Sequence, residues 1–564
     1  MIRQRPSSAR QTALLLLCFA GATACIAQST ASDTVYHLRG TVVDGITGKP
    51  LPRALVKSGD QRLATMTDTD GKFAIDISVP ERPAGTGNSF RGFGSGVFLM
   101  AQKPGYLIQQ GRPTLIPLND TLSSTPVEIR LMPAAVVTGH VSSAASDSAS
   151  GVRVTLLWHR VQDGHRFWTL AGTTNTNAHG DFRFPDLNPG EYAVLTAQWA
   201  GEQPQPAQRN TVTQQYPSTF YGDVRNLASS TKLHLHYGDT TPTDIHLHLA
   251  AFYPITVPVT TGSPNSPVNA RLLGPENLSG TPVLRYNRAE NAIEGSLPSG
   301  DYTLMLSNAV AGPQQLFAQL PLHVESEPVR TGTIALAPPA TVQIHVHTQF
   351  TKQDSSTNTS MVISGGRQSG NSSRITVQTP PLQVLLRSEE GNGGSGVSHP
   401  TSNGDLIIEN LQPGRYYVQE QIFRGYASSL TSGGVDLRDH PLIVNASNPP
   451  DPIDVTLRDD TATLTGTVTS GNDPLPQMSF VVLLPTDNAG RYTQAFAGPD
   501  GKFAASNIPP GSYHVIAFRG QPVQLPYRDA DAMHRYDDKG VAVTITADGS
   551  QQLNIPLIDP PEEE

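Results

Sequence analysis

The chain is poor in charge and rich in residues that break helices. Charged side chains make up 15% of its 564 residues and the formal net charge is −9. Such a balance excludes the clustered Lys and Arg that nucleic-acid phosphates require, so we expect no nucleic-acid partner. The 50 Gly and 47 Pro favour many short strands joined by turns. At roughly 100 to 150 residues per domain, the length predicts about four to six domains.

The first residues are typical of an export signal. Arg3, Arg5 and Arg10 precede an apolar stretch over residues 13–27 that ends in small residues. This stretch is shorter than the ~20 residues that a membrane span needs. We expect residues 1–27 to be a signal peptide. The mature protein is then exported to the periplasm, the cell surface or the medium.

Both cysteines of the chain, Cys18 and Cys25, lie in this segment, so the mature chain forms no disulfide. Residues 22–25 loosely resemble a lipobox, which makes a lipoprotein anchored at Cys25 the alternative to cleavage after Ala27. No later apolar stretch reaches membrane length, and we expect no transmembrane segment in the mature chain.

The mature chain repeats four short phrases in a fixed order. An opening Gly-x-Val strand is followed by a turn with Gly that leads into a mostly aromatic strand. A Pro-Gly or Ser-Gly turn then leads into a strand that starts with Tyr, and an alternating strand closes the unit. The opening strands start at residues 40, 139 and 466, and the Gly turns at residues 70, 179, 403 and 500. The tyrosine phrases start at residues 187, 297, 411 and 508, and the closing strands at residues 127, 244, 333, 454 and 553.

The tyrosine phrases are about 110 residues apart, which is the length of one β-sandwich and identifies a domain-sized repeat. The expected fold class is all-β, a tandem array of about five immunoglobulin-like or transthyretin-like sandwiches. We expect no long helix, and one or two helical turns over residues 528–539. The expected domains are residues 34–132, 133–250, 251–338, 339–459 and 460–558.

The phrases together resemble the bacterial carboxypeptidase regulatory-like domain family. The best match is residues 40–77, with the opening Gly40-Thr41-Val42 and the turn Asp70-Gly71-Lys72-Phe73. Residues 460–558 match nearly as well, and residues 251–338 match only in their tyrosine turn and closing strand. The resemblance implies seven-stranded sandwiches, a fold shared with starch-binding-like modules. It also implies a non-catalytic, accessory role.

No catalytic constellation accompanies these phrases. None of the 16 His is followed three residues later by Glu, so the zinc motif of carboxypeptidases is absent. The sequence also lacks a nucleophile elbow and a Walker-type phosphate loop. Residues 68–71 resemble the start of a calcium loop but lack its final acidic ligand, which favours a simple turn. We predict no enzyme activity and no cofactor.

Three His-x-His pairs are weak candidates for metal binding, because residues i and i+2 of a strand point to one face. The alternative is that these histidines occupy solvent-facing strand positions that alternate with apolar residues. We favour this alternative and predict no bound metal. The candidates are His234, His236, His246 and His248, which would lie on nearby strands, with His345 and His347 as a further pair.

Aromatic residues carry the candidate ligand site. All three Trp fall within residues 133–250, and their phase with apolar neighbours favours the core. Residues 201–230 form a long polar connection that contains Tyr216, Phe220 and Tyr221. These three either form an exposed contact patch that binds a ligand or pack onto their own domain.

Two functions remain open from the sequence. The first is a structural or interaction protein, a semi-rigid rod of sandwiches that spaces or presents something outside the cytoplasm, because the interdomain joins are short. The second is a carbohydrate-binding protein that uses loop aromatics. The expected partner is a cell-envelope protein or a polysaccharide, and its identity does not follow from the sequence.

Overall fold

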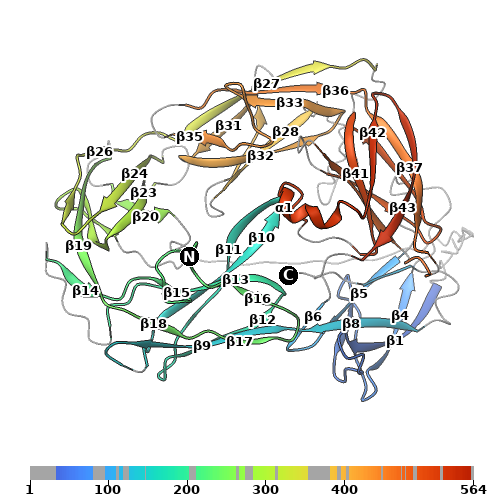
Figure 1. Cartoon of the computed structure of the whole chain (residues 1–564), viewed down its shortest axis with the longest axis horizontal. Coiled ribbons are helices and arrows are strands. Elements are labelled where there is room, and N and C mark those ends of the chain that lie inside the picture. Colours follow the sequence, from blue (N-terminus) through green and yellow to red (C-terminus); the bar gives the residue numbers. More distant parts are fainter. Residues whose placement is uncertain are drawn as a thin grey trace, which may run out of the picture. The chain divides into compact units, whose positions relative to one another are not determined.

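The computed structural model is built almost entirely of β-strands (Figure 1). It divides into two compact units, Met1–Lys103 with Gly111–Leu131 and Pro104–Gln110 with Met132–Glu564, which are described separately. The residues that the structure describes are 34–79, 96–108, 114–117, 126–146, 148–201, 211–261, 266–273, 284–310, 315–352, 381–389, 395–401, 405–445, 449–471, 473–476, 478–486, 492–520 and 525–559. The predicted signal segment, Cys18 and Cys25 lie outside them.

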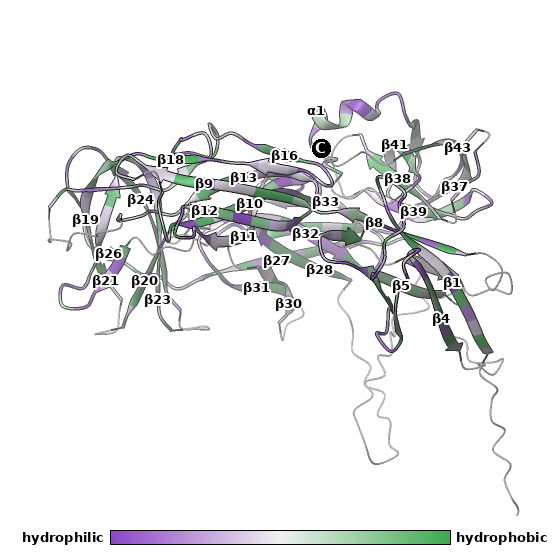
Figure 2. Cartoon of the chain, turned by 90° about the horizontal axis from the view of Figure 1, so that it is seen from below, coloured by the Kyte–Doolittle hydropathy of each residue, from purple (hydrophilic) through white to green (hydrophobic). Residues whose placement is uncertain are grey.

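The first unit holds one sandwich of two sheets, with strand orders β4-β1-β8 and β3-β2-β5-β7. Apolar side chains alternate with polar ones along its strands, which Figure 2 shows as successive bands along β1 and β4. The bounds are β1 (Thr34–Asp44), β2 (Leu55–Ser58), β3 (Ala64–Met66), β4 (Lys72–Val79), β5 (Gly96–Gln102), β7 (Thr114–Pro117) and β8 (Val127–Pro133). Strand β6 (Tyr106–Ile108) belongs to residues 104–110 of the second unit.

The second sandwich begins at β9, and its two sheets have the orders β11-β10-β13-β15 and β12-β9-β17, with β16 on β13 and β18 on β9. Its strands are β9 (Ala135–Ser143), β10 (Arg153–Gln162), β11 (His165–Asn175), β12 (Asp181–Leu187), β13 (Gly190–Thr196), β15 (Thr219–Phe220), β16 (Leu233–Leu235), β17 (Thr240–Pro242) and β18 (Ile245–Leu247). Asp163-Gly164, a dipeptide typical of two-residue hairpin turns, joins β10 to β11 with φ of 50° and 80°.

The third sandwich pairs a sheet of order β14-β19-β22-β21, with β25 and β26 on β19, with a sheet of order β20-β23-β24. Its strands are β14 (Thr213–Gln215), β19 (Ala250–Thr260), β20 (Val268–Leu273), β21 (Leu284–Asn287), β22 (Ala292–Pro298), β23 (Gly300–Asn308), β24 (Phe317–Val324), β25 (Val329–Arg330) and β26 (Ile334–Ala335). Strand β14 comes from the connection 201–230, so part of that connection joins the sheet of the following sandwich.

The fourth sandwich has the strand orders β30-β31-β27-β36-β33-β34 and β29-β28-β32-β35. Its strands are β27 (Ala340–Gln349), β28 (Leu382–Ser388), β29 (Gly396–Val397), β30 (His399–Pro400), β31 (Leu406–Leu411), β32 (Gly414–Ile422), β33 (Tyr426–Ser432), β34 (Val435–Asp436), β35 (Leu442–Val444) and β36 (Ile453–Arg458).

The last domain differs from the others because its strands do not form two separate sheets. Its strands form one sheet, β38-β39-β40-β37-β43-β41-β42, and an extra β38–β41 pairing closes it. The bounds are β37 (Ala462–Thr469), β38 (Ser479–Pro485), β39 (Thr493–Ala497), β40 (Lys502–Ile508), β41 (Gly511–Phe518), β42 (Val541–Ile545) and β43 (Ser550–Ile558). The predicted helical turns are confirmed as α1 (Ala530–Met533) and the 3-10 turn His534–Tyr536.

All five domains share one pairing rule, and this confirms the predicted array of about five β-domains. The opening strand pairs parallel with the closing strand and antiparallel with one strand between them, which follows the Gly turn in every domain except the third. It does so as β1 with β4 and β8, β9 with β12 and β18, β19 with β22 and β26, β27 with β31 and β36, and β37 with β40 and β43. The third domain, which matched the phrases weakly, obeys the same rule.

The repeated phrases meet in space at the opening glycine. Gly139 lies opposite Phe182 in the β9–β12 register, and a Cβ there would lie 2.1 Å from the Thr243 carbonyl oxygen and 2.4 Å from the Phe182 ring. The aromatic ring therefore covers a position that only glycine can occupy. The first and last domains repeat this contact with Gly40 and Phe73 and with Gly466 and Phe503.

The tyrosine phrase is a corner held by its own hydroxyl. The Tyr192 Oη donates to the carbonyl oxygen of Asn188 at 2.8 Å, four residues earlier. The same bond forms at Tyr302, Tyr416 and Tyr513. A β-bulge precedes three of the four corners, because the register shifts by one residue around Asp186, Asn410 and Asn507, which adopt φ of 57°, 61° and 58°. Asp and Asn tolerate this left-handed conformation better than other non-glycine residues.

A buried carboxylate anchors the last residue of the fourth domain, beside its join with the fifth. Asp459 accepts hydrogen bonds from the backbone N–H of Thr351 at 2.7 Å and of Lys352 at 3.1 Å, and from the Arg424 guanidinium at 3.0 Å. Burial alone would raise the pKa of Asp459, but these hydrogen bonds outweigh it and lower the pKa to about 2. Lys352 also forms an ion pair with Asp548 of the fifth domain at 2.6 Å.

We expect Gly139→Ala to destabilise the second sandwich by about 1–3 kcal/mol, because the added methyl group overlaps a carbonyl and a ring. Gly172→Ala is the matched control, since its nearest neighbour is the Phe184 ring at 3.6 Å. Urea unfolding of both variants checks this. Equal unfolding midpoints would contradict the proposed steric role of Gly139.

We expect acid to loosen the join at Asp459. Its pKa is lowered below the ordinary 3.8, so its stabilisation is fully present above about pH 4 and is lost as pH falls through about 2. Melting temperatures between pH 5 and pH 2 should fall more steeply for the native chain than for Asp459→Asn. The exposed Asp538→Asn is the control and should follow the native curve.

Candidate functional site

The expected exposed patch at residues 216–221 is wrong for two of its three members. Tyr216 is 4% exposed and Phe220 is 0% exposed. Phe220 lies on β15 opposite Leu195 of β13 and packs with Leu157. Tyr221 is half-buried against the main core of the second sandwich. The structure therefore supports the alternative, a segment packed onto its own domain.

The physical reason is that one sheet of the second sandwich is apolar on both faces. Leu156 and Leu157 follow one another on β10 and are both fully buried, although successive strand residues point to opposite faces. Leu156 packs in the core, whereas Leu157 lies on the outer face and must be shielded from solvent by another apolar side chain. Phe220 provides that cover. The sequence pattern of the loop alone does not reveal this need.

The His-x-His pairs do not converge on one another. His234 lies on β16 of one sheet, whereas His246 lies on β18 of the other sheet. His246 bonds to Ser142 Oγ at 2.9 Å, and its ring meets His248 edge-on at 4.9 Å between centroids. His236 pairs with Asp239 at 3.2 Å. Among the residues described, no group of three His, Cys, Asp or Glu side chains could hold a metal ion.

The remaining sequence candidates are structural. The Asp68 carboxylate accepts the backbone N–H of Asp70 at 2.9 Å and of Lys72 at 2.8 Å, as in a turn. Trp158 packs on the core and stacks with Tyr192 at 5.8 Å between ring centroids. Trp168 stacks with His159 at 4.5 Å and Trp199 meets Tyr216 at 5.3 Å. Of the part of the chain that is described, no helix is long and apolar enough to cross a membrane.

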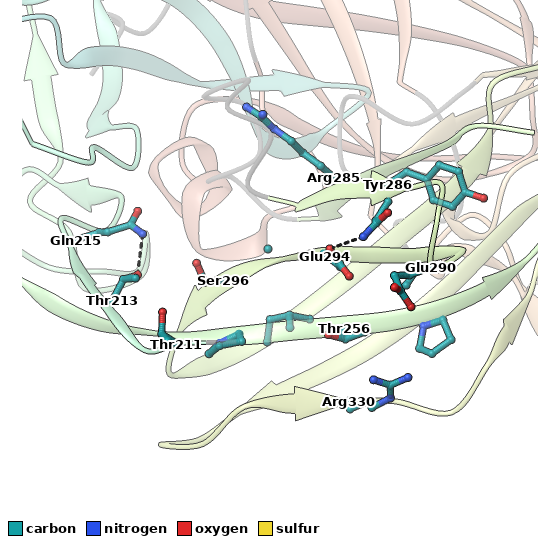
Figure 3. Close-up of a pocket in the computed structure, with 16 residues that line it drawn as sticks. Thr211, Thr213, Gln215, Thr256, Arg285, Tyr286, Glu290, Glu294, Ser296 and Arg330 are labelled. Carbon is teal, nitrogen blue, oxygen red and sulfur yellow. Dashed lines mark hydrogen bonds between the residues drawn. The ribbon is translucent and has the colours of Figure 1, made fainter. Parts of the chain in front are cut away.

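The structure instead presents a cleft on the third sandwich (Figure 3), which the motifs did not indicate. The cleft has a volume of about 520 Å³ and lies over the outer face of the sheet β14-β19-β22-β21. It lies on this face because β19 alternates Ile255, Val257 and Val259, which are buried in the core, with residues that point outward. The outward residues that line it are Thr213, Gln215, Pro254, Thr256, Pro258, Arg285, Asn287, Ala292, Glu294, Ser296 and Arg330.

The strand register places charged side chains in one row across the cleft. Arg285 of β21 lies opposite Glu294 of β22, and Glu294 lies opposite Thr256 of β19. Thr256 in turn lies opposite Arg330 of β25. Side chains directly opposite on one face are neighbours, about 5 Å apart at Cβ. The row therefore reads guanidinium, carboxylate, hydroxyl, guanidinium.

Hydrogen bonds hold the carboxylate of this row and leave its arginines available. Glu294 Oε2 accepts from the Asn287 amide at 2.9 Å, and the two are drawn joined in Figure 3. The same view shows the Arg285 side chain directed away from Glu294. Within the described residues, neither Arg285 nor Arg330 forms an ion pair. Gln215, at the far wall, is fixed by a bond to Thr213 at 2.9 Å and one from Gln198 at 2.7 Å.

A second hollow of about 420 Å³ lies in the second unit, where side chains of the second, fourth and fifth domains meet. The His165 ring stacks on Tyr417 at 3.9 Å between centroids, and the Tyr417 hydroxyl donates to Glu389 at 3.0 Å. Burial, followed by the positive charge of Arg528, lowers the pKa of His165 to about 4. Burial, followed by the charge of Glu389, raises the pKa of Tyr417 to about 12.

Arg528 joins these three domains. Its guanidinium donates to the carbonyl oxygen of Asp163 in the second domain at 3.1 Å and to that of Arg438 in the fourth. Arg166 also pairs with Asp529 at 3.3 Å. The expected rod, in which only consecutive domains touch, does not account for these contacts. Arg528 lies in an unrepeated segment, so repeats give no signal for it.

Comparisons with known proteins leave the family open. No family model and no curated protein matches the chain, so the resemblance to carboxypeptidase regulatory-like domains stays a prediction. The chain is similar at 10% identity to the Bacillus anthracis TIE protein, over 73% of this chain and 69% of that one, with a TM-score of 0.15. It is similar at 11% identity to BcpA, the major pilin subunit of Bacillus cereus, over 75% and 98%, with a TM-score of 0.14.

A third similarity, at 12% identity, is to GBS52, the minor pilin of Streptococcus agalactiae, over 38% of this chain and 95% of that one, with a TM-score of 0.19. TM-scores this low carry no argument about the function of this chain.

We expect Arg528→Ala to loosen the contact between the second, fourth and fifth domains, because two carbonyl oxygens then lose their donor. Small-angle scattering should show a larger radius of gyration for this variant. Arg519→Ala removes the same charge from an exposed pair with Asp559 and should leave the radius unchanged. An unchanged radius for both would show that Arg528 does not hold the domains together.

Proposed function

We propose that this chain is a non-catalytic binding protein that acts outside the cytoplasm and uses the cleft of the third sandwich to hold a polar ligand. One observation carries the proposal: the outer face of the sheet gathers hydroxyl, amide, carboxylate and guanidinium groups into a cleft of about 520 Å³. A concave site with convergent polar groups is a candidate for ligand binding, because such groups fix the orientation of a bound molecule. The export signal predicted over residues 1–27 supports the location.

Carbohydrate is the ligand class that this lining favours. Thr213, Thr256 and Ser296 offer hydroxyl groups, and Asn287 and Gln215 offer amides, so the cleft can donate to and accept from a ligand rich in hydroxyls. Few apolar side chains line it, in contrast to grooves that hold hydrophobic peptides. The proposal keeps the carbohydrate hypothesis but moves it from the loop aromatics to a sheet face.

A non-catalytic role is supported by the chemistry of the lining. Glu290 and Glu294 are the carboxylates of the cleft, and Glu294 accepts a hydrogen bond from the Asn287 side-chain amide. The lining contains no His, Cys or Lys that could serve as a nucleophile or proton shuttle. Holding a ligand by hydrogen bonds is what these groups can do.

We expect the purified mature chain to bind at least one glycan class on an array, with or without a chelator, and Thr256→Trp to abolish that binding by filling the cleft. Trp is well tolerated on a strand, so the fold should persist. Thr348→Trp, at an exposed position of β27 in the fourth sandwich, is the control and should bind as the native chain does. Equal binding by both variants, or silence across the array, would refute the site.

A further inference from the structure

We propose that the ligand is an acidic polysaccharide that runs across the strands of the third sandwich, with its carboxylates on Arg285 and Arg330. The inference rests on the proposed function and names the chemistry of its ligand. It starts from the row Arg285, Glu294, Thr256 and Arg330, which lie opposite one another in register.

The two arginines are spaced for an extended ligand. Three strand-to-strand steps separate them, and at about 4.8 Å per step their Cα atoms lie ~14 Å apart. A chain that crosses the strands can place a separate carboxylate on each guanidinium group, and it then passes over Glu294 and Thr256.

Both guanidinium groups are free to take a carboxylate. Arg285 and Arg330 are exposed and form no ion pair within the described part of the chain. Arg285 stands opposite Glu294, yet that carboxylate is bonded to Asn287 instead. Guanidinium groups match carboxylates in a two-point, charge-assisted geometry.

The acidic residues of the cleft favour a sugar over an acidic peptide. Glu290 and Glu294 place two carboxylates between and beside the arginines, and these repel a ligand that carries carboxylates alone. A uronic-acid unit carries a carboxylate for an arginine and hydroxyl donors for a glutamate on the same ring. The alternation of donors and acceptors along the row fits such a repeating ligand.

The decisive experiment is calorimetric titration of the mature full chain with an oligogalacturonate and with a neutral oligosaccharide of the same length. We expect the oligogalacturonate to bind more tightly. Arg285→Ala and Arg330→Ala should each weaken its binding about 10- to 100-fold, the usual loss for a charge-assisted hydrogen bond. Arg288→Ala removes the same charge from the β21–β22 turn, outside the cleft lining, and should change affinity less than threefold. Unchanged melting temperatures exclude misfolding.

The possible outcomes separate this inference from the proposed function. Equal affinity for the neutral and acidic oligosaccharides, abolished by Thr256→Trp, would overturn the acidic ligand and keep the cleft as a sugar site. Tighter binding of poly-glutamate than of oligogalacturonate would overturn the sugar in favour of an acidic peptide. Equal losses in the Arg285, Arg330 and Arg288 variants would show a diffuse charge effect and overturn the row. Binding of no probe would overturn both proposals.

Discussion

Three of the five domains depend on a glycine of the opening strand that an aromatic ring covers. At Gly139 the parallel closing strand and the Phe182 ring occupy the space that any side chain would fill. This contact brings together the opening strand, the strand after the Gly turn, and the closing strand. It fixes the register of three strands that lie more than 40 residues apart along the chain. A one-residue slip would turn the apolar face of each strand to solvent.

The domains share the pattern of their cores but differ in what covers the outer faces of their sheets. The second sandwich carries a second apolar face at Leu157 and covers it with Phe220. The fifth carries one at Phe480 and Phe518, and covers it with Tyr527 and Tyr536 from the segment that contains α1. The third leaves an outer face polar and open, and that face is the cleft. Differences in outer faces, on a common core, are where function can arise in a repeated fold.

The contacts between domains also come from residues outside the repeated phrases. Arg528 and Asp529 lie on the segment that covers the fifth domain, and they reach the hairpin of the second. Asp459 and Lys352 fix the join of the fourth and fifth domains through backbone N–H groups and one ion pair. These polar links are few and specific, which is typical of interfaces between domains of one chain.

The sequence by itself determined the fold class, the repeat, the turns and the hairpin at Asp163-Gly164, because these depend on local alternation and on backbone conformations that few residues adopt. The sequence predicted the position of the tyrosine in each corner but not the hydrogen bond of its hydroxyl group. The acceptor of Tyr192, the carbonyl oxygen of Asn188, comes within reach only when the turn has folded. The sequence did not decide between the exposed and the packed alternative at residues 216–221, because exposure there is set by strands from other parts of the chain. The row from Arg285 to Arg330 was decided only by the tertiary structure: charged residues on separate strands are indistinguishable from ordinary solvated positions until the register places them side by side.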